Sequence, residues 1–182
     1  MAKTGNFGFG SPKFSIPSAD EAKYLSFSIQ LGGQAKLVDT DYATFRNKGG
    51  INDYTMANSV GAAISSFPFN AGVEPLPVAC VLKSIIVTGI VEETGVTAID
   101  VAVVKLVFAD GDTSYSSIST SHTESVTGIT SGRRFKSSSS VSASAASTFN
   151  AGDTISIAVR KPSGTGTQYA NGVSVTLTFE ES

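Results

Sequence analysis

The stretch "VSVTLTFE", from Val173 to Glu180, alternates apolar side chains with hydroxyl-bearing or charged ones. Successive side chains of an extended strand point to opposite faces, so this period of two predicts a half-buried β-strand. The stretch "TISIAVRK", from Thr154 to Lys161, has the same period. A loop that contains Pro162 and Gly172 is expected between them. The apolar side chains of the two predicted buried faces are Val173, Val175, Leu177, Phe179, Ile155, Ile157 and Val159.

Three further stretches upstream predict strands. "LSFSIQL", from Leu25 to Leu31, alternates in the same way. The segments 78–91, "VACVLKSIIVTGIV", and 97–109, "TAIDVAVVKLVFA", are rich in β-branched residues, as is typical of strands near the middle of a sheet. No long window has helical periodicity, although Ser18 and Glu21 fit a capping box for a short helical turn. The predicted class is therefore all-β, an antiparallel β-sandwich or jelly roll.

The chain divides into two unequal parts. Residues 1–50 are rich in Gly and Pro and contain one good strand, which predicts an extended N-terminal arm. Residues 51–182 carry a continuous strand pattern and are expected to form the jelly-roll domain. Within them, the segment 114–147 is polar, and "VSASAAST", from Val141 to Thr148, alternates small side chains. We predict a strand for this last stretch, with a loop as the alternative.

The tetrapeptide "FNAG" occurs twice, from Phe69 to Gly72 and from Phe149 to Gly152. The residues that follow the two copies do not match, which argues against an internal duplication. Asn and Gly tolerate the left-handed backbone of tight turns, and a preceding Phe can pin such a turn to the core. The repeat is therefore interpreted as one kind of turn used twice, in preference to a shared binding loop.

Composition excludes several classes of partner. The formal net charge is -2 and charged residues make up 15% of the chain, so there is no bulk attraction to nucleic acid or to an anionic membrane. Ser and Thr together supply about a quarter of the residues, well above ordinary usage. No apolar run approaches the ~20 residues of a membrane helix, and the start lacks the apolar core of a signal peptide. We expect a protein made and folded in the cytoplasm.

The residues that carry chemistry do not form the patterns that enzymes need. His122 is the single histidine, and Cys80 is the single cysteine, expected as a small core side chain that forms no internal disulfide. Asp110 and Asp112 fit a hairpin turn better than a calcium loop. Neighbouring carboxylates at positions 92 and 93 would point apart on a strand. The sequence thus predicts no enzyme, no metal site and no cofactor.

The C-terminal part of the chain resembles a known family. The elements are "LPVACVLKSIIVTG", "VVKLVFADGDTSYSSIST" and "STFNAGDTISIAVRKPSGTGTQYANGVSVTLTFE", which cover roughly residues 75–182. They resemble the jelly-roll domains of the tumour-necrosis-factor and complement type found on phage fibres, phage head-decoration proteins and bacterial exosporium filaments. The resemblance implies a homotrimer that serves as a structural or adhesive knob of a virion.

Two clusters are candidate partner-binding residues. Arg133, Arg134 and Lys136 surround Phe135 in "SGRRFK" and would suit an acidic subunit surface or a host glycan. Three aromatic residues of the arm would suit a groove in another virion protein. These residues are Phe7, Phe9 and Phe14.

Together these features predict a non-enzymatic bacteriophage virion protein, a capsid decoration or head-fibre protein anchored by its arm. The alternative is a receptor-binding or glycan-binding knob of a tail or fibre. An enzyme is the third and least favoured class.

Overall fold

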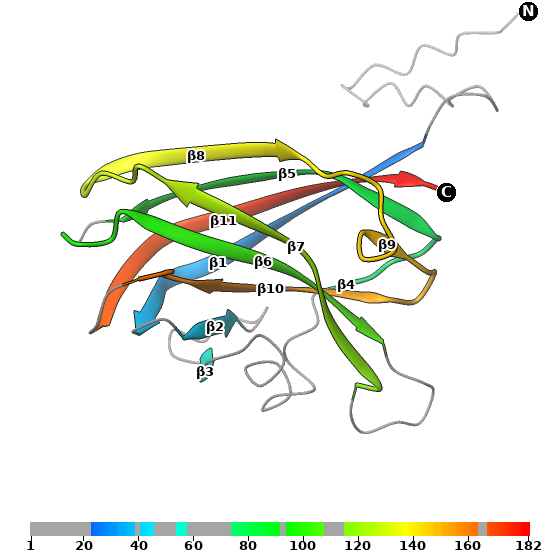
Figure 1. Cartoon of the computed structure of the whole chain (residues 1–182), viewed down its shortest axis with the longest axis horizontal. Coiled ribbons are helices and arrows are strands. Elements are labelled where there is room, and N and C mark those ends of the chain that lie inside the picture. Colours follow the sequence, from blue (N-terminus) through cyan, green and yellow to red (C-terminus); the bar gives the residue numbers. More distant parts are fainter. Residues whose placement is uncertain are drawn as a thin grey trace, which may run out of the picture.

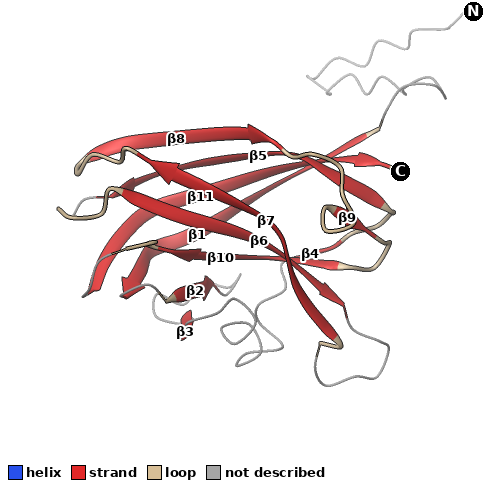
Figure 2. Ribbon diagram, viewed as in Figure 1, coloured by secondary structure: helices blue, strands red, loops and turns tan. Residues whose placement is uncertain are grey.

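The computed structural model describes residues 23–38, 41–45, 54–57, 74–91, 94–107, 115–163 and 167–182. Within these ranges every regular element is a strand, and no helix occurs (Figure 2). The predicted all-β class is confirmed. The helical turn predicted from Ser18 lies largely outside the described residues, and strand begins at Tyr24.

The strands form two antiparallel sheets that pack face to face as a β-sandwich (Figure 1). Sheet A has the order β1-β11-β5-β8, and β9 also pairs with β5. Sheet B has the order β3-β2-β10-β6-β7, and β4 also pairs with β10. The strands of sheet A are β1 (Tyr24–Val38), β11 (Thr167–Glu181), β5 (Cys80–Val91), β8 (Arg133–Ser140) and β9 (Thr148–Phe149). Those of sheet B are β3 (Tyr54–Ala57), β2 (Tyr42–Phe45), β10 (Thr154–Arg160), β6 (Ala98–Val107), β7 (Ser117–Thr127) and β4 (Glu74–Pro75).

The order of the eight principal strands is that of a jelly roll. The first strand of each sheet pairs with a late strand, β1 with β11 and β2 with β10. The next strands then lie inside these pairs, since β5 pairs with β11 and β6 pairs with β10. The last two, β8 and β7, form the far ends of the two strand orders. Such nesting of hairpins across two sheets is the double Greek key of jelly rolls.

The core lies between the sheets and uses the alternating residues that the sequence predicted. Val173, Val175, Leu177 and Phe179 of β11 are buried there, as are Ile155, Ile157 and Val159 of β10. Phe149 is fully buried and meets Phe179 edge-on, with ring centroids 5.4 Å apart. The second "FNAG" copy is therefore a turn pinned to the core by its Phe, as predicted, whereas the first copy lies outside the described residues.

Strand β6 is buried on both faces. Its inward residues join the core between the sheets, while Ala102, Val104 and Leu106 form a second cluster on the outer face of sheet B. Tyr42 and Ala158 belong to the same cluster. The near-continuous apolar run of this segment is thus explained, because both faces of the strand are covered.

Two local predictions were wrong. The stretch "VSASAAST" is mostly a loop, in which Ser144 N–H donates to the Ser147 hydroxyl over 2.8 Å and the Thr148 hydroxyl donates to the Ser144 carbonyl over 2.8 Å. Serine and threonine hydroxyls here take the place of strand hydrogen bonds. Gly172, predicted in a loop, lies inside β11, where the pairing with β5 shifts between Asn171 and Ser174. With φ 54° it is left-handed, and it forms a bulge that glycine accepts readily.

The N-terminal part of the chain is built into the sandwich from Tyr24 onward. Strand β1 pairs with β11 over most of its length, and Ile29 and Leu37 are core residues. Strand β2 pairs with β10. Both strands fall within the stretch 1–50 that the sequence analysis set apart as an arm with one strand.

Candidate functional site

The basic cluster predicted from "SGRRFK" forms the first half of β8, at the edge of sheet A. Its register with β5 sorts the four residues onto two faces, because Arg134 pairs with Ile90 and Lys136 pairs with Thr88. Phe135 pairs with Gly89, which lies on the core-facing side of β5. The Phe135 side chain packs against the core. Arg134 and Lys136 therefore share the outer face of sheet A.

Arg133 does not belong to this outer group. It pairs with the buried residue Val91 and so lies on the same side of β8 as Phe135, although its own side chain is exposed at the strand end. The four residues are adjacent in the sequence, but the alternation of side chains along the strand places Arg133 and Phe135 on one face and Arg134 and Lys136 on the other. Two cations remain together on the outer face.

A depression in the outer face of sheet A contains these two cations. It encloses about 430 Å³ and is lined by Thr88, Gly89, Ile90, Arg134, Phe135, Lys136 and Gly172. Thr88 and Ile90 come from β5, the cations come from β8, and Gly172 comes from the bulge of β11. Its size falls in the range of ordinary small-molecule sites, about 300–1,000 Å³.

The two cations of the depression differ from Lys83 and Arg160, which are ion-paired. Lys83 Nζ lies 2.6 Å from a Glu180 carboxylate oxygen, and Arg160 Nε lies 2.9 Å from Asp100 Oδ2. Within the described part of the chain, by contrast, Arg134 and Lys136 face no carboxylate within 4.0 Å. Both are exposed. Within the described ranges, no carboxylate therefore compensates the positive charge of the depression.

The surroundings of the depression are rich in hydroxyl groups. The outward residues of β11 and β8 include Ser174, Thr176 and Ser138, and the Ser28 and Thr176 hydroxyls hydrogen-bond each other over 2.9 Å. A hydroxyl both donates and accepts hydrogen bonds. This face can therefore contact polar groups of either kind.

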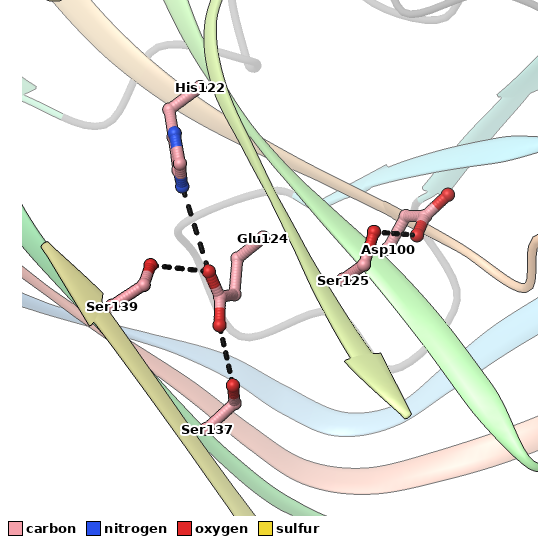
Figure 3. A network of polar contacts seen from close by, with 6 residues as sticks. All are labelled: Asp100, His122, Glu124, Ser125, Ser137 and Ser139. Atoms are coloured by element: carbon pink, nitrogen blue, oxygen red, sulfur yellow. Dashed lines mark hydrogen bonds and ion pairs between the residues drawn. The ribbon is translucent and has the colours of Figure 1, made fainter. Parts of the chain in front are cut away.

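A separate polar network joins the two sheets at their β7 and β8 ends (Figure 3). Glu124 of β7 is 8% exposed and points toward β8. Its two carboxylate oxygens accept hydrogen bonds from the Ser137 and Ser139 hydroxyls, each over 2.5 Å. His122 Nε2 lies 3.6 Å from Glu124 Oε2. One buried carboxylate thus connects strands of both sheets.

Hydrogen bonding determines the charge state of Glu124. Burial alone would raise the pKa of its carboxyl group, but the hydrogen bonds from Ser137 and Ser139, together with His122, outweigh burial and hold the pKa below its ordinary value. The serine-rich run of β8 is therefore not an arbitrary polar segment. Its inward hydroxyls solvate a buried negative charge.

This Ser, His and Glu combination is not arranged as a catalytic triad. A triad requires the serine to donate to the histidine, which the acid then orients. Here both serine hydroxyls donate to the carboxylate, and His122 Nε2 has no hydrogen-bond partner among the residues that the structure describes. The geometry assigns the network to holding the sheet edges together.

The remaining predicted residues have varied outcomes. Cys80 is fully buried and free, as expected of a core side chain. Phe7, Phe9 and Phe14 lie outside the described residues, as do the two carboxylates at 92 and 93 and those at 110 and 112. Across the described ranges, no group of three or more His, Cys, Asp or Glu side chains could hold a metal ion. No helix in those ranges is long and apolar enough to span a membrane.

Sequence reasoning missed two features of this region. It left β7 and β8 within a polar segment, and it did not find the network around Glu124. His122, Glu124 and Val126 occupy alternate positions in the sequence, but the segment that contains them is polar and resembles a loop. The serine run carries no apolar signal at all.

Comparisons with known proteins give only remote likenesses. No family model matches the chain, and no curated protein matches it by sequence. Among solved structures, it is similar to the infectious bursal disease virus Gx strain, with 12% identity and a TM-score of 0.38 over 98% of this chain and 36% of that chain. It is similar to infectious bursal virus derived T=1 particles, with 13% identity and a TM-score of 0.36 over 92% of this chain and 34% of that chain.

A third similar structure is that of Desmodium yellow mottle tymovirus. The identity is 12% and the TM-score is 0.27, over 94% of each chain. The chain spans about a third of the length of the two infectious bursal virus chains it matches. At this level of similarity, the strand order of the chain itself remains the evidence for its fold.

Proposed function

We propose that the chain is a non-enzymatic structural protein of a bacteriophage virion, a capsid decoration or head-fibre protein. The observation that supports this most directly is the jelly-roll strand order, an architecture that viral capsid domains and lectin domains use. Fold alone does not fix function, so the proposal also draws on the sequence resemblance to phage knob domains. The polar network around Glu124 is compatible with this role, because its hydrogen bonds join a strand of one sheet to a strand of the other.

The protein would act as a homotrimer anchored by its N-terminal arm. Strand β1 begins at Tyr24, so residues 1–22 precede the sandwich and contain Phe7, Phe9 and Phe14. Aromatic side chains set between Gly and Pro residues suit insertion into a groove of a capsid protein. The partners would be other copies of this chain and capsid subunits, with neither nucleic acid nor membrane, and the location would be the virion.

Purified virions of the encoding phage provide the test. We expect a fixed copy number by quantitative mass spectrometry, and a native mass of the isolated protein near three times 18.7 kDa by light scattering. Replacement of Phe7, Phe9 and Phe14 by Ser should lower the copy number at least about tenfold, because each aromatic anchor contributes ~1–2 kcal/mol. The matched control replaces Ser11, Ser15 and Ser18 of the same arm by Ala.

Two results would contradict the proposal. A chain that is absent from particles is not a virion protein. If the Phe variant is incorporated as well as the wild type, the arm is not the anchor. A monomeric native mass would overturn the trimer alone.

A second function is favoured by the depression. A knob exposed on a virion, with a basic site that has no carboxylate partner among the described residues, would also suit attachment to a host surface, as in the alternative of a receptor- or glycan-binding module. The two functions are compatible, because the arm and the depression use different residues. They are separable by experiment for the same reason.

A further inference from the structure

We propose that the depression in the outer face of sheet A binds a carboxylate-bearing sugar, through Arg134 and Lys136. This inference specifies the ligand of the second function above and is independent of the virion role. It begins from the two cations, which share one face of β8 and face no carboxylate among the described residues. A site with paired positive charges and no internal counter-charge is complementary to an anion.

A carboxylate is the anion that this pair fits best. The guanidinium of Arg134 presents donors in a planar fork that matches the two oxygens of a carboxylate. Lys136, two residues along the same face, adds a second cationic donor. A single carboxylate in the depression can contact both groups, and each charge-assisted bond is stronger than a neutral one.

The rest of the lining favours a sugar over an acidic peptide. Thr88 supplies a hydroxyl that can donate to or accept from a sugar hydroxyl, and Ile90 supplies an apolar surface for ring C–H groups. Ser138 and Ser174 extend the hydroxyl-rich surface beside it. Its volume of about 430 Å³ suits one or two sugar rings. A long polyanion such as nucleic acid is disfavoured by the overall charge of -2.

Gly172 keeps the depression open. A Cβ at this position would meet nothing within 4 Å, so the missing side chain leaves free space at the wall of the site. The residue has φ 54°, a left-handed conformation that Asn also tolerates. Gly172→Asn is therefore a variant that narrows the depression with little backbone strain.

Titration calorimetry with the full chain tests the proposal. The acidic probes are trigalacturonic acid and 3′-sialyllactose, the neutral probes are maltotriose and lactose, and triglutamate is the acidic peptide. We expect at least one acidic sugar to bind with a Kd below about 1 mM, and the neutral sugars and triglutamate at least about tenfold more weakly. Binding should weaken with rising salt.

Variants distinguish the site from general surface charge. Arg134→Gln and Lys136→Gln should each weaken binding at least about tenfold, and Gly172→Asn should weaken it similarly. The matched control is Arg133→Gln, which removes the same charge from the adjacent residue on the other face of β8 and should change the Kd less than about twofold. Thermal melting of each variant reports whether the fold is kept.

Three outcomes would overturn the inference. One is the absence of binding of both acidic sugars at 10 mM, about tenfold above the weakest Kd expected of the site. Another is equal binding of triglutamate, which would make the site a general anion site. The third is an equal loss in Arg133→Gln. None of these outcomes changes the copy number in virions, so failure here is distinguishable from failure of the structural role.

Discussion

The ring of Phe135 occupies the space where residue 89 would carry a side chain. A Cβ built on Gly89 would lie 2.7 Å from Phe135 Cζ and 3.2 Å from a methyl group of Val173. The two residues are register partners across β5 and β8. The aromatic side chain therefore fills the gap that glycine leaves in the strand and covers the core beneath the depression.

Gly89→Ala should destabilise the protein by about 1–3 kcal/mol, because the added methyl group forces the ring of Phe135 to move. The sign of the change in stability is informative, because alanine in an unobstructed strand is more favourable than glycine by roughly 0.5–1 kcal/mol. Urea denaturation measures the free energy of unfolding. In a Phe135→Leu background the same substitution should cost less, and equal costs in both backgrounds would contradict a direct contact.

Glu124 should make the protein sensitive to acid. Its pKa is lowered in the folded state from an ordinary value of 4.5, so its stabilisation is fully present above pH 4.5 and is lost as the pH falls through the lower folded value. Glu124→Gln should therefore flatten the dependence of Tm on pH between about pH 5 and 2. Glu181→Gln, nearer the surface, serves as the control.

The serines of the network permit a second measurement. Ser137→Ala with Ser139→Ala leaves the buried carboxylate without its two donors, and should cost roughly 2–4 kcal/mol at pH 7. The same double substitution in a Glu124→Gln background should cost less, because no charge then remains to be solvated. A cost of equal size in both backgrounds would show that the serines act independently of Glu124.

Cys80 should resist thiol reagents in the native protein. Burial, with a smaller contribution from Asp153, raises the pKa of its thiol to about 11, and its side chain is fully buried. At pH 8 almost no thiolate is present, so reaction with dithiobis(nitrobenzoic acid) should be at least about a hundredfold slower than in the unfolded chain. A fast reaction of the folded protein would show that β5 opens locally at this end.

Asp100 links three neighbouring strands of sheet B. It accepts hydrogen bonds from the Ser125 hydroxyl over 2.7 Å and from Arg160 Nε over 2.9 Å, and the Arg160 guanidinium lies 4.6 Å from the centre of the Tyr42 ring. Asp100→Ala should lower the free energy of unfolding by about 1–3 kcal/mol. A double-mutant cycle with Arg160→Met measures the coupling, and strictly additive effects would contradict the pairing.

The apolar strands were predictable because their signal is local. The alternation in β10 and β11, and the near-continuous apolar run of β6, follow from which faces are buried, and burial requires apolar side chains at fixed spacing. The turn at Gly152, with φ 89°, was predictable for a similar reason, since few residues other than Gly accept that conformation. Strands β7 and β8 were not predictable in this way. Their inward positions are partly polar, and a run of serines has the composition of a loop.

The sequence by itself determined the all-β class, the strands that face the core and the role of Cys80 as a core residue. Only the tertiary structure decided which polar residues act together. Glu124 is compatible with burial because β8 brings two serine hydroxyls from the opposite sheet to its carboxylate. Arg134 and Lys136 are separated from Arg133 because pairing with β5 fixes the face of each residue. Apolar burial depends on spacing along one strand, whereas polar sites depend on strand pairing between distant parts of the chain.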